Sequence, residues 1–276
     1  MLSRGNLRAI KRRIASTEST MQITRAMQMV ATARLNKIQK QFRGVKEYAN
    51  YAEKILKKVP KNEESFYVKK GEGTLIFVIS PDMGLAGSFP ADIPKEALRV
   101  KSKTDDFKGY FVLGTKAYSL LKKENVIEKE LNFFDIPKVD HAEYLLESLF
   151  QIMRNKNISK VKVVYGELKN ALVQLPKSYD LLPIPDEIFE IDSRYEFEPE
   201  EEIVFEDAAY QYLLSKMYSF LFETKLSELH ARQNAMKNAT DNAHDLIEEL
   251  NLEYNKQRQA SITQELIEIV NGANMQ

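Results

Sequence analysis

The C-terminal stretch of this chain, from about Glu206 to Val270, constrains the fold more than any other. It contains no proline, and no glycine before Gly272. Proline and glycine are the residues that most strongly interrupt a helix. At about 1.5 Å per residue, one unbroken helix of this length spans roughly 100 Å, which exceeds the width of a single globular domain. Such a helix must project from its domain, and it needs a partner.

The N-terminal end supplies that partner, because about Asn6 to Val59 is also free of proline and contains a lone Gly44. A stripe with alternating spacings of four and three residues, as in a coiled coil, runs along each stretch. The first stripe comprises Ile10, Ile14, Thr17, Met21, Thr24, Gln28, Ala31, Leu35, Ile38, Phe42, Val45, Ala49, Ala52, Leu56 and Val59. The second, more polar stripe comprises Phe222, Leu226, Leu229, Gln233, Met236, Thr240, Ala243, Ile247, Leu250, Tyr254, Gln257 and Ser261.

Two apolar sets lie off these stripes. Ile23, Met27 and Val30 make the first helix apolar on more than one side, which indicates that a third surface packs there. The last turns of the second helix are apolar at a chain end, which is typical of a tip that enters a socket in a partner. The alternative is a tip packed on its own domain, and the length of the helix argues against it.

The middle block has a different periodicity. Pro60 ends the first helix, and Thr74–Ser80 is a short apolar run typical of a buried strand. Asp140 and Glu143 form a predicted capping box for the helix that follows them. We predict strands at 74–80, 110–113, 126–134, 160–165 and 171–175, and helices at 93–100, 115–123 and 143–154. This alternation predicts a mostly parallel sheet with helices on its faces.

The loop after the first predicted strand lacks the known nucleotide-binding patterns. Pro81–Phe89 has neither the glycine spacing of a dinucleotide fingerprint nor the Gly-Lys-Ser/Thr of a phosphate loop. The simpler interpretation is a tight strand-to-helix turn that needs both Gly84 and Gly87.

Composition excludes several classes of function. The chain has no cysteine, so thiolate chemistry and disulfides are excluded. No apolar run is long enough for a membrane span, and the N-terminus lacks the apolar core of a signal peptide. Residues 1–58 carry 14 Lys and Arg against 3 acidic residues, whereas residues 186–207 carry 11 acidic residues against one Arg. This segregation favours charged partner surfaces, either an acidic protein or nucleic acid.

Four segments carry a resemblance to a known family. They are Ile10-Lys-Arg-Arg-Ile-Ala-Ser-Thr, Gln22-Ile-Thr-Arg-Ala-Met-Gln-Met-Val-Ala-Thr-Ala-Arg-Leu, Ala235-Met-Lys-Asn-Ala-Thr-Asp-Asn-Ala and the long run from Glu253 to Ala273. Together they resemble the terminal signatures of the γ subunit of F-type ATP synthase. Shorter pieces, such as Leu181-Leu-Pro-Ile, match in order between them.

The resemblance implies a fold of class α/β, with a long antiparallel coiled coil of the N- and C-terminal helices and a Rossmann-like α/β middle domain. The expected domains are 1–59, 60–205 and 206–276. The implied function is the central rotor shaft of F1Fo ATP synthase, which turns as an asymmetric cam inside a ring of three α and three β subunits. Its other implied partners are the ε subunit, the δ subunit and the membrane c-ring. The resemblance implies no catalytic site and no cofactor in this chain; ATP, ADP and Mg would bind the β subunits.

The resemblance also implies contact residues. Arg258, Gln259 and Thr263 match residues that hydrogen-bond a β loop, with Arg258 as the charged member. The basic residues of the first helix would face an acidic region of β. The expected contacts with α and β are Arg258, Gln259, Thr263, Met27, Arg25, Arg34, Ile262, Leu266, Ile269 and Val270.

Some features depart from the family. Members often have Ser-Asp-Arg-Gly-Leu-Cys-Gly-Gly after the first strand, where this chain has Ser80-Pro-Asp-Met-Gly-Leu-Ala-Gly-Ser, so any role of that Arg is in doubt. The cysteine-bearing insert of the chloroplast versions is absent. No transit peptide precedes the first motif, so we expect a bacterial protein, peripheral on the cytoplasmic face of the plasma membrane.

Three other functions remain as alternatives. A coiled-coil scaffold with an α/β head would self-associate without α or β subunits. A nucleic-acid binder would lose affinity steeply as salt rises. A nucleotide-using enzyme would be stabilised by its nucleotide.

Overall fold

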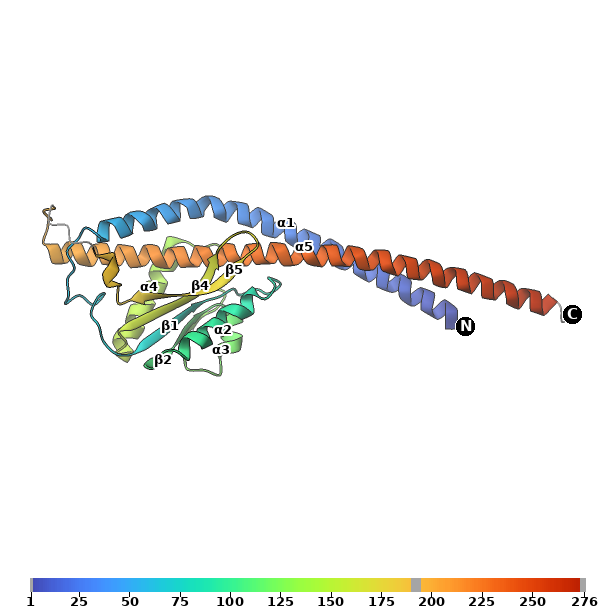
Figure 1. The fold of residues 1–276 in the computed structure, drawn as a ribbon, viewed down its shortest axis with the longest axis horizontal. Coiled ribbons are helices and arrows are strands. Elements are labelled where there is room, and N and C mark those ends of the chain that lie inside the picture. The colour runs from blue at the N-terminus through green and yellow to red at the C-terminus, as the bar shows by residue number, and fades with distance from the viewer. Residues whose placement is uncertain (1, 190–194, 274–276) are drawn as a thin grey trace. The chain divides into compact units, whose positions relative to one another are not determined.

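The computed structural model describes residues 2–189 and 195–273. Two long helices, α1 (Leu2–Leu56) and α5 (Glu201–Ala273), stand at the two ends of the chain (Figure 1). Between them lie β1 (Thr74–Ile79), α2 (Phe89–Lys101), β2 (Phe107–Leu113), α3 (Thr115–Leu121), β3 (Val126–Glu130), α4 (Val139–Lys156), β4 (Lys160–Leu168), β5 (Gln174–Leu182) and the 3-10 turn η1 (Asp186–Ile188).

The chain divides into two compact units, and the division cuts both long helices. One unit, the coil unit, consists of Met1–Val30 and Gln233–Gln276. The other, the head unit, consists of Ala31–Arg232. The domain boundaries predicted from the sequence follow the helix ends instead, and they stay a prediction.

The head unit contains one five-stranded sheet in the order β3-β2-β1-β4-β5. The first four strands are parallel, and β5 pairs antiparallel with β4 at the edge. The predicted mostly parallel α/β architecture is therefore confirmed. In the sheet, β2 lies on one side of β1 and β4 lies on the other. The strand order therefore reverses at β1.

Both faces of the central strand β1 are buried, and its side chains alternate between the two faces. Leu75, Phe77 and Ile79 of β1 pack under α4 and the first part of α5. Ile76 and Val78 point to the other face and pack under α2 and α3. The sheet thus has helices on both faces, as the alternation of elements predicts.

The parts of α1 and α5 that belong to the head unit pack against each other. Leu35, Ile38, Phe42 and Val45 of α1 meet Phe222, Leu226 and Leu229 of α5 in one hydrophobic cluster. The rings of Phe42 and Phe222 are stacked with centroids 6.0 Å apart. These are stripe residues, so the predicted coiled-coil seam is confirmed here.

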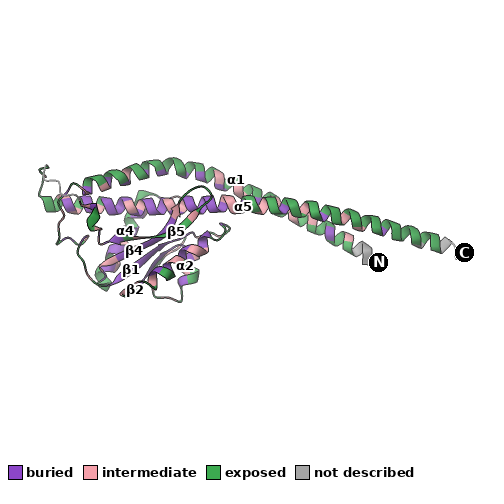
Figure 2. Cartoon of the chain, in the orientation of Figure 1, coloured by how far each residue is buried: buried purple, intermediate pink, exposed green. Residues whose placement is uncertain are grey.

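The coil unit continues the same register with smaller and more polar residues. Ile10, Ala243 and Leu250 are buried, and the Thr24 and Thr240 hydroxyls are 2.8 Å apart in a hydrogen bond across the seam. Every predicted stripe position on both helices is buried or half-buried. In Figure 2 the head-unit part of α5 is mostly buried, whereas its C-terminal part is mostly exposed.

Four local predictions were wrong. Helix α4 begins at Val139 rather than Glu143, and the capping pair is not Asp140 with Glu143: the Lys138 backbone N–H donates to His141 Nδ1 at 3.1 Å. Strand β3 ends at Glu130 rather than 134, and β5 is Gln174–Leu182 rather than 171–175. Helix α5 begins at Glu201, with Glu201 and Glu202 in its first turn, where negative charge suits the helix dipole.

Candidate functional site

The predicted contact residues on α5 all lie on exposed helix surface of the coil unit. Arg258, Gln259 and Thr263 are exposed, and the Thr263 hydroxyl donates to the Gln259 carbonyl one turn earlier at 3.0 Å. Residues four apart share a helix face, so Gln259 and Thr263 present adjacent polar groups. The Arg258 guanidinium lies beside them in the sequence and is solvated. This set can offer a partner two or more directional hydrogen bonds.

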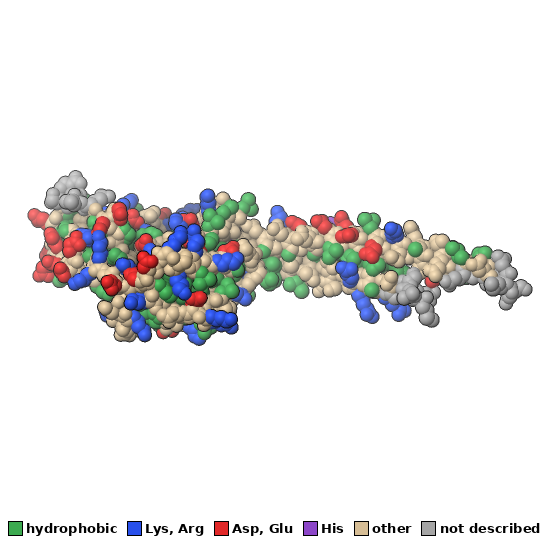
Figure 3. Space-filling view, turned by 60° about the horizontal axis from the view of Figure 1, so that its bottom comes forward, with side chains coloured by type: hydrophobic (Ala, Val, Ile, Leu, Met, Phe, Trp, Pro, Cys, Tyr) green, Lys and Arg blue, Asp and Glu red, His purple; other side chains and the backbone are tan. Residues whose placement is uncertain are grey.

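The apolar residues of the last turns are exposed as well. Ile262, Leu266, Ile267, Ile269 and Val270 have 50–66% of their surface accessible. Figure 3 shows apolar and charged side chains interspersed along the coil unit. Exposed apolar residues gathered in the last turns of one helix are typical of a site of contact with another molecule.

The predicted residues on α1 divide between the two units. In the coil unit Arg25 is exposed and Met27 is half-buried, while the neighbouring Ile23 and Val30 remain more than half exposed. No described residue of the coil unit supplies the third surface that this apolar set predicts. A partner surface is therefore needed to bury it.

Arg34 lies in the head unit, where its guanidinium donates to Asp135 Oδ1 at 2.7 Å. Sequence reasoning missed this partner, because the two residues are 101 positions apart and no local pattern links them. Both side chains stay partly exposed, so the ion pair is solvated and contributes little to stability.

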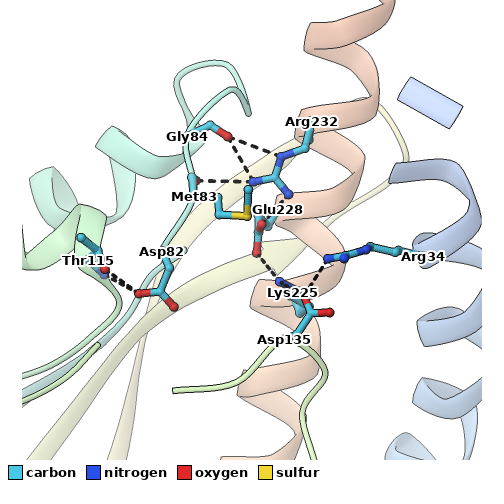
Figure 4. Close-up of polar contacts among 9 residues, drawn as sticks. All are labelled: Arg34, Asp82, Met83, Gly84, Thr115, Asp135, Lys225, Glu228 and Arg232. Carbon is cyan, nitrogen blue, oxygen red and sulfur yellow. Dashed lines mark hydrogen bonds and ion pairs between the residues drawn. The ribbon is translucent and has the colours of Figure 1, made fainter. Parts of the chain in front are cut away.

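The carboxyl edge of the sheet holds a hollow of about 230 Å³ next to β1, where the strand order reverses. In open α/β sheets ligands bind at such a reversal. Here, however, Asp82 Oδ1 accepts hydrogen bonds from the backbone N–H and hydroxyl of Thr115, both at 2.8 Å (Figure 4). It also accepts one from the Asn132 N–H at 2.9 Å. The Asp82 carboxylate therefore already accepts the hydrogen bonds that these groups could donate to a phosphate. This arrangement argues against nucleotide binding in the hollow.

The loop after β1 needs one glycine rather than the predicted two. Gly87 has φ +59°, in the left-handed region that favours glycine. Gly84 does not have a positive φ; the second left-handed residue is Leu85, also at φ 59°. The two-glycine explanation of this turn was therefore wrong at Gly84.

Other site classes find no support in the described part of the chain. Among residues 2–189 and 195–273, no group of three or more His, Asp or Glu side chains is arranged to hold a metal ion. In the same ranges, no helix has the length and apolar character needed to cross a bilayer.

Comparison with known proteins decides the family. The sequence pattern of the family described as ATP synthase matches residues 6–275. The ATP synthase gamma chain of Mycoplasmopsis pulmonis is 36% identical over 278 residues, which cover 97% of this chain and 99% of that protein. The chain belongs to the ATP synthase gamma-chain family.

Two solved structures of ATP synthases contain chains with the same fold as this one. A chain in the cryo-EM structure of the central stalk and c-ring of the Tetrahymena thermophila mitochondrial ATP synthase is 26% identical, with a TM-score of 0.63 over 79% of this chain and 99% of that one. A chain of the Euglena gracilis mitochondrial ATP synthase, at 19% identity, has the same fold with a TM-score of 0.73 over 98% of this chain and 94% of that one. The predicted resemblance to γ subunits is thus confirmed over nearly the whole chain.

Proposed function

We propose that this gamma chain is the central rotor shaft of an F1Fo ATP synthase. It couples ion flow through a membrane rotor ring to ATP synthesis or hydrolysis at β subunits, by turning as an asymmetric cam inside a ring of three α and three β subunits. One copy serves each complex, with ε, δ and the c-ring as further partners. The complex lies on the cytoplasmic face of a bacterial plasma membrane.

The observation that carries this proposal is the unequal surface of the coil unit. Its α1 part exposes basic residues such as Arg25, whereas the end of α5 exposes apolar ones such as Leu266 and Val270. Three identical β sites can differ only if something asymmetric touches them differently, because a ligand shifts a conformational equilibrium only by its differential affinity for the two states. A shaft with unlike sides meets this condition.

The chemistry belongs to the partners. This chain acts as a non-catalytic subunit and binds no cofactor itself, while ATP, ADP and Mg occupy the β subunits. Shaft angle and nucleotide occupancy then bias each other reciprocally, as linkage requires. The translocated ion is either a proton or sodium.

The two kinds of exposed residue on α5 have separate roles. Apolar contacts at Ile262, Leu266, Ile269 and Val270 are non-directional, so rotation against them breaks no fixed set of hydrogen bonds. Arg258, Gln259 and Thr263 supply directional contacts that depend on angle. The apolar end of α5 thus allows rotation against the surrounding subunits. The polar residues of α5, together with Met27, Arg25 and Arg34 on α1, make the contacts that differ from one facing subunit to the next.

The first experiment mixes the chain with its cognate α and β subunits and measures ATPase activity together with the mass of the product. We expect one copy of this chain in an active complex with three of each partner. A chain that forms a rod with itself and associates with neither partner would instead favour the coiled-coil scaffold.

The second experiment replaces Arg258 by Ala in that complex. Loss of a charge-assisted hydrogen bond of about 1.5–3 kcal/mol predicts a fall in steady-state ATP turnover of at least about tenfold. The melting temperature of the isolated chain should not change, because Arg258 is exposed. Lys103→Ala, an exposed charge in the head unit, is the control. Turnover by the Arg258 variant equal to that of the control would refute the assigned role.

A further inference from the structure

Helix α5 contacts the sheet of the head unit through apolar residues along most of its buried length. Its last turns in that unit bury five polar side chains, His230 among them, and four of these bond to β4, to the loop after β1 or to one another. Thr224, Ser227, Glu228 and Arg232 are each no more than 7% exposed. Thr224 lies one turn from Ser227, and Glu228 lies one turn from Arg232, so the four form two pairs on adjoining sides of the helix. We call these four residues the polar stripe.

The first half of the polar stripe bonds to one residue of β4. The Gly166 N–H donates to Thr224 Oγ1 at 3.1 Å, and the Ser227 hydroxyl donates to the Gly166 carbonyl at 3.1 Å. The absence of a side chain at Gly166 lets Phe89 of α2 and Ser227 of α5 both lie close to the strand. A Cβ at this position would lie 2.3 Å from the ring of Phe89, so only glycine fits. Helix α5 thus forms hydrogen bonds with both the N–H and the carbonyl of Gly166 on β4.

The second half bonds to the loop after β1. The Arg232 guanidinium pairs with Glu228 at 2.6 Å and donates to the Gly84 carbonyl at 3.1 Å (Figure 4). Glu228 also pairs with Lys225 at 3.1 Å, and Lys225 is itself only 12% exposed. The buried Glu228 carboxylate therefore forms ion pairs with the buried Arg232 and the half-buried Lys225, and Arg232 also donates to the loop backbone.

These bonds differ in kind from the apolar contacts upstream. Apolar contacts resist separation but tolerate sliding, whereas hydrogen bonds weaken steeply when they are misaligned. Turning α5 against the sheet would break several bonds at once, and it would leave buried charges unpaired, which is costly. The polar stripe therefore fixes the angle of α5 on the head unit rather than only its position.

We propose that the polar stripe is the torque-bearing joint between the α/β head and the shaft helix. Thr224, Ser227, Glu228 and Arg232 are positioning residues: they touch no nucleotide, and they keep head and helix turning together. The inference rests on the proposed rotor function. It predicts a defect that appears only when torque must pass between head and helix.

The test uses the double variant Glu228→Gln/Arg232→Met in the whole ATP synthase. Both charges of the Glu228–Arg232 pair are removed together, so neither of these two is left buried without its counter-charge. Lys225, which also pairs with Glu228, keeps Asp135 at 4.0 Å as its counter-charge. The control is Glu96→Gln/Arg99→Met on α2, which removes a bidentate pair of similar length, 2.7 Å, whose Arg side chain is exposed.

Two rates are compared for each variant. One is ATP synthesis by holoenzyme in vesicles under an imposed ion gradient, where the head is loaded. The other is ATP hydrolysis by the complex of α, β and this chain alone, where the head is unloaded. We expect the ratio of synthesis to hydrolysis to fall at least about fivefold for the polar-stripe variant and to stay constant for the control.

Equal losses in both rates would overturn the inference, because they would show a general loss of structure. An unchanged ratio with both rates intact would overturn it too. If the double variant does not fold, Arg232→Lys is judged by the same ratio, since it keeps the charge and loses the planar fork. If the unmodified chain forms no active complex with α and β, the proposed function itself fails, and this inference fails with it.

Discussion

The coil unit and the head unit share the two long helices α1 and α5, but the two units bury very different side chains. All three hydrophobic clusters of the described chain draw only on residues 35–231, within the head unit. Among its described residues, the coil unit buries four hydrophobic side chains, Ile10, Met236, Ala243 and Leu250, and adds Thr24 and Ser261 to its seam. Buried apolar side chains can stabilise the head unit, whereas the coil unit buries few of them.

This difference has a functional reason. Small and polar seam residues let two helices approach closely but contribute little hydrophobic free energy. The apolar surface of the coil unit that its own seam leaves uncovered, at Ile23, Val30 and the last turns of α5, is available to a partner. We therefore expect the coil unit to gain more stability from a partner than the head unit does.

The largest expected effect tests the core of the head unit. Phe77→Ala empties a fully buried position on β1, and large-to-small changes of this type cost about 3–5 kcal/mol. Urea unfolding of the isolated chain, followed by circular dichroism, measures the loss. Leu250→Ala, at a buried seam position of the coil unit, should change the main transition by less than about 1 kcal/mol, because that unit opens locally at lower cost. Equal losses would remove the contrast between the units.

A smaller effect concerns a charge in the head unit. Hydrogen bonds from Thr74 and Lys160 lower the pKa of Asp106 to about 2, from an ordinary value of 3.8. Because the folded pKa is depressed, the ionised group stabilises the fold above about pH 4, and this contribution is lost as pH falls toward 2. Asp106→Asn should cost at most about 1 kcal/mol at neutral pH, since the pair is partly solvated.

The measurement for Asp106 is the free energy of unfolding of both chains from pH 7 to pH 2. The difference between them should shrink below pH 4. A difference that is constant over this range would show that the charge of Asp106 contributes nothing.

The smallest expected effect on stability concerns the exposed apolar residues in the last turns of α5. Ile262→Ser and Leu266→Ser replace exposed residues, and exposed substitutions usually change stability by less than about 0.5 kcal/mol. The melting temperature of the isolated chain should stay the same, while assembly with α and β weakens. A clear loss of stability in the isolated chain would mean that the tip packs on the chain itself.

Much of the fold was predictable because it depends on periodicity. The four-three alternation from Ile10 to Val59 placed each stripe residue correctly, and the apolar run at residues 74–80 located β1. The errors fell at ends and edges. The strand predicted at 171–175 is β5, Gln174–Leu182, and its prediction stopped before Pro176. Proline is tolerated there because β5 lies at the edge of the sheet.

The candidate site was predictable only in part. Arg258, Gln259 and Thr263 came from a resemblance, and their exposure fits a contact role that still has to be tested. The polar stripe was not recognised. Its one signal in the sequence was a group of polar residues at helical spacing, and such a group is more often a solvated face.

By itself, the sequence determined the two long helices, the register of their seam and the change to an α/β block, because each depends on residues that are close along the chain. Only the tertiary structure decided that β5 runs antiparallel, that Asp135 holds Arg34, and that Gly166 admits α5 to the sheet. These contacts join residues 58 or more positions apart, or depend on which strand becomes the edge. A local pattern carries no information about such distant pairings, because they form only when the packed core brings the elements together.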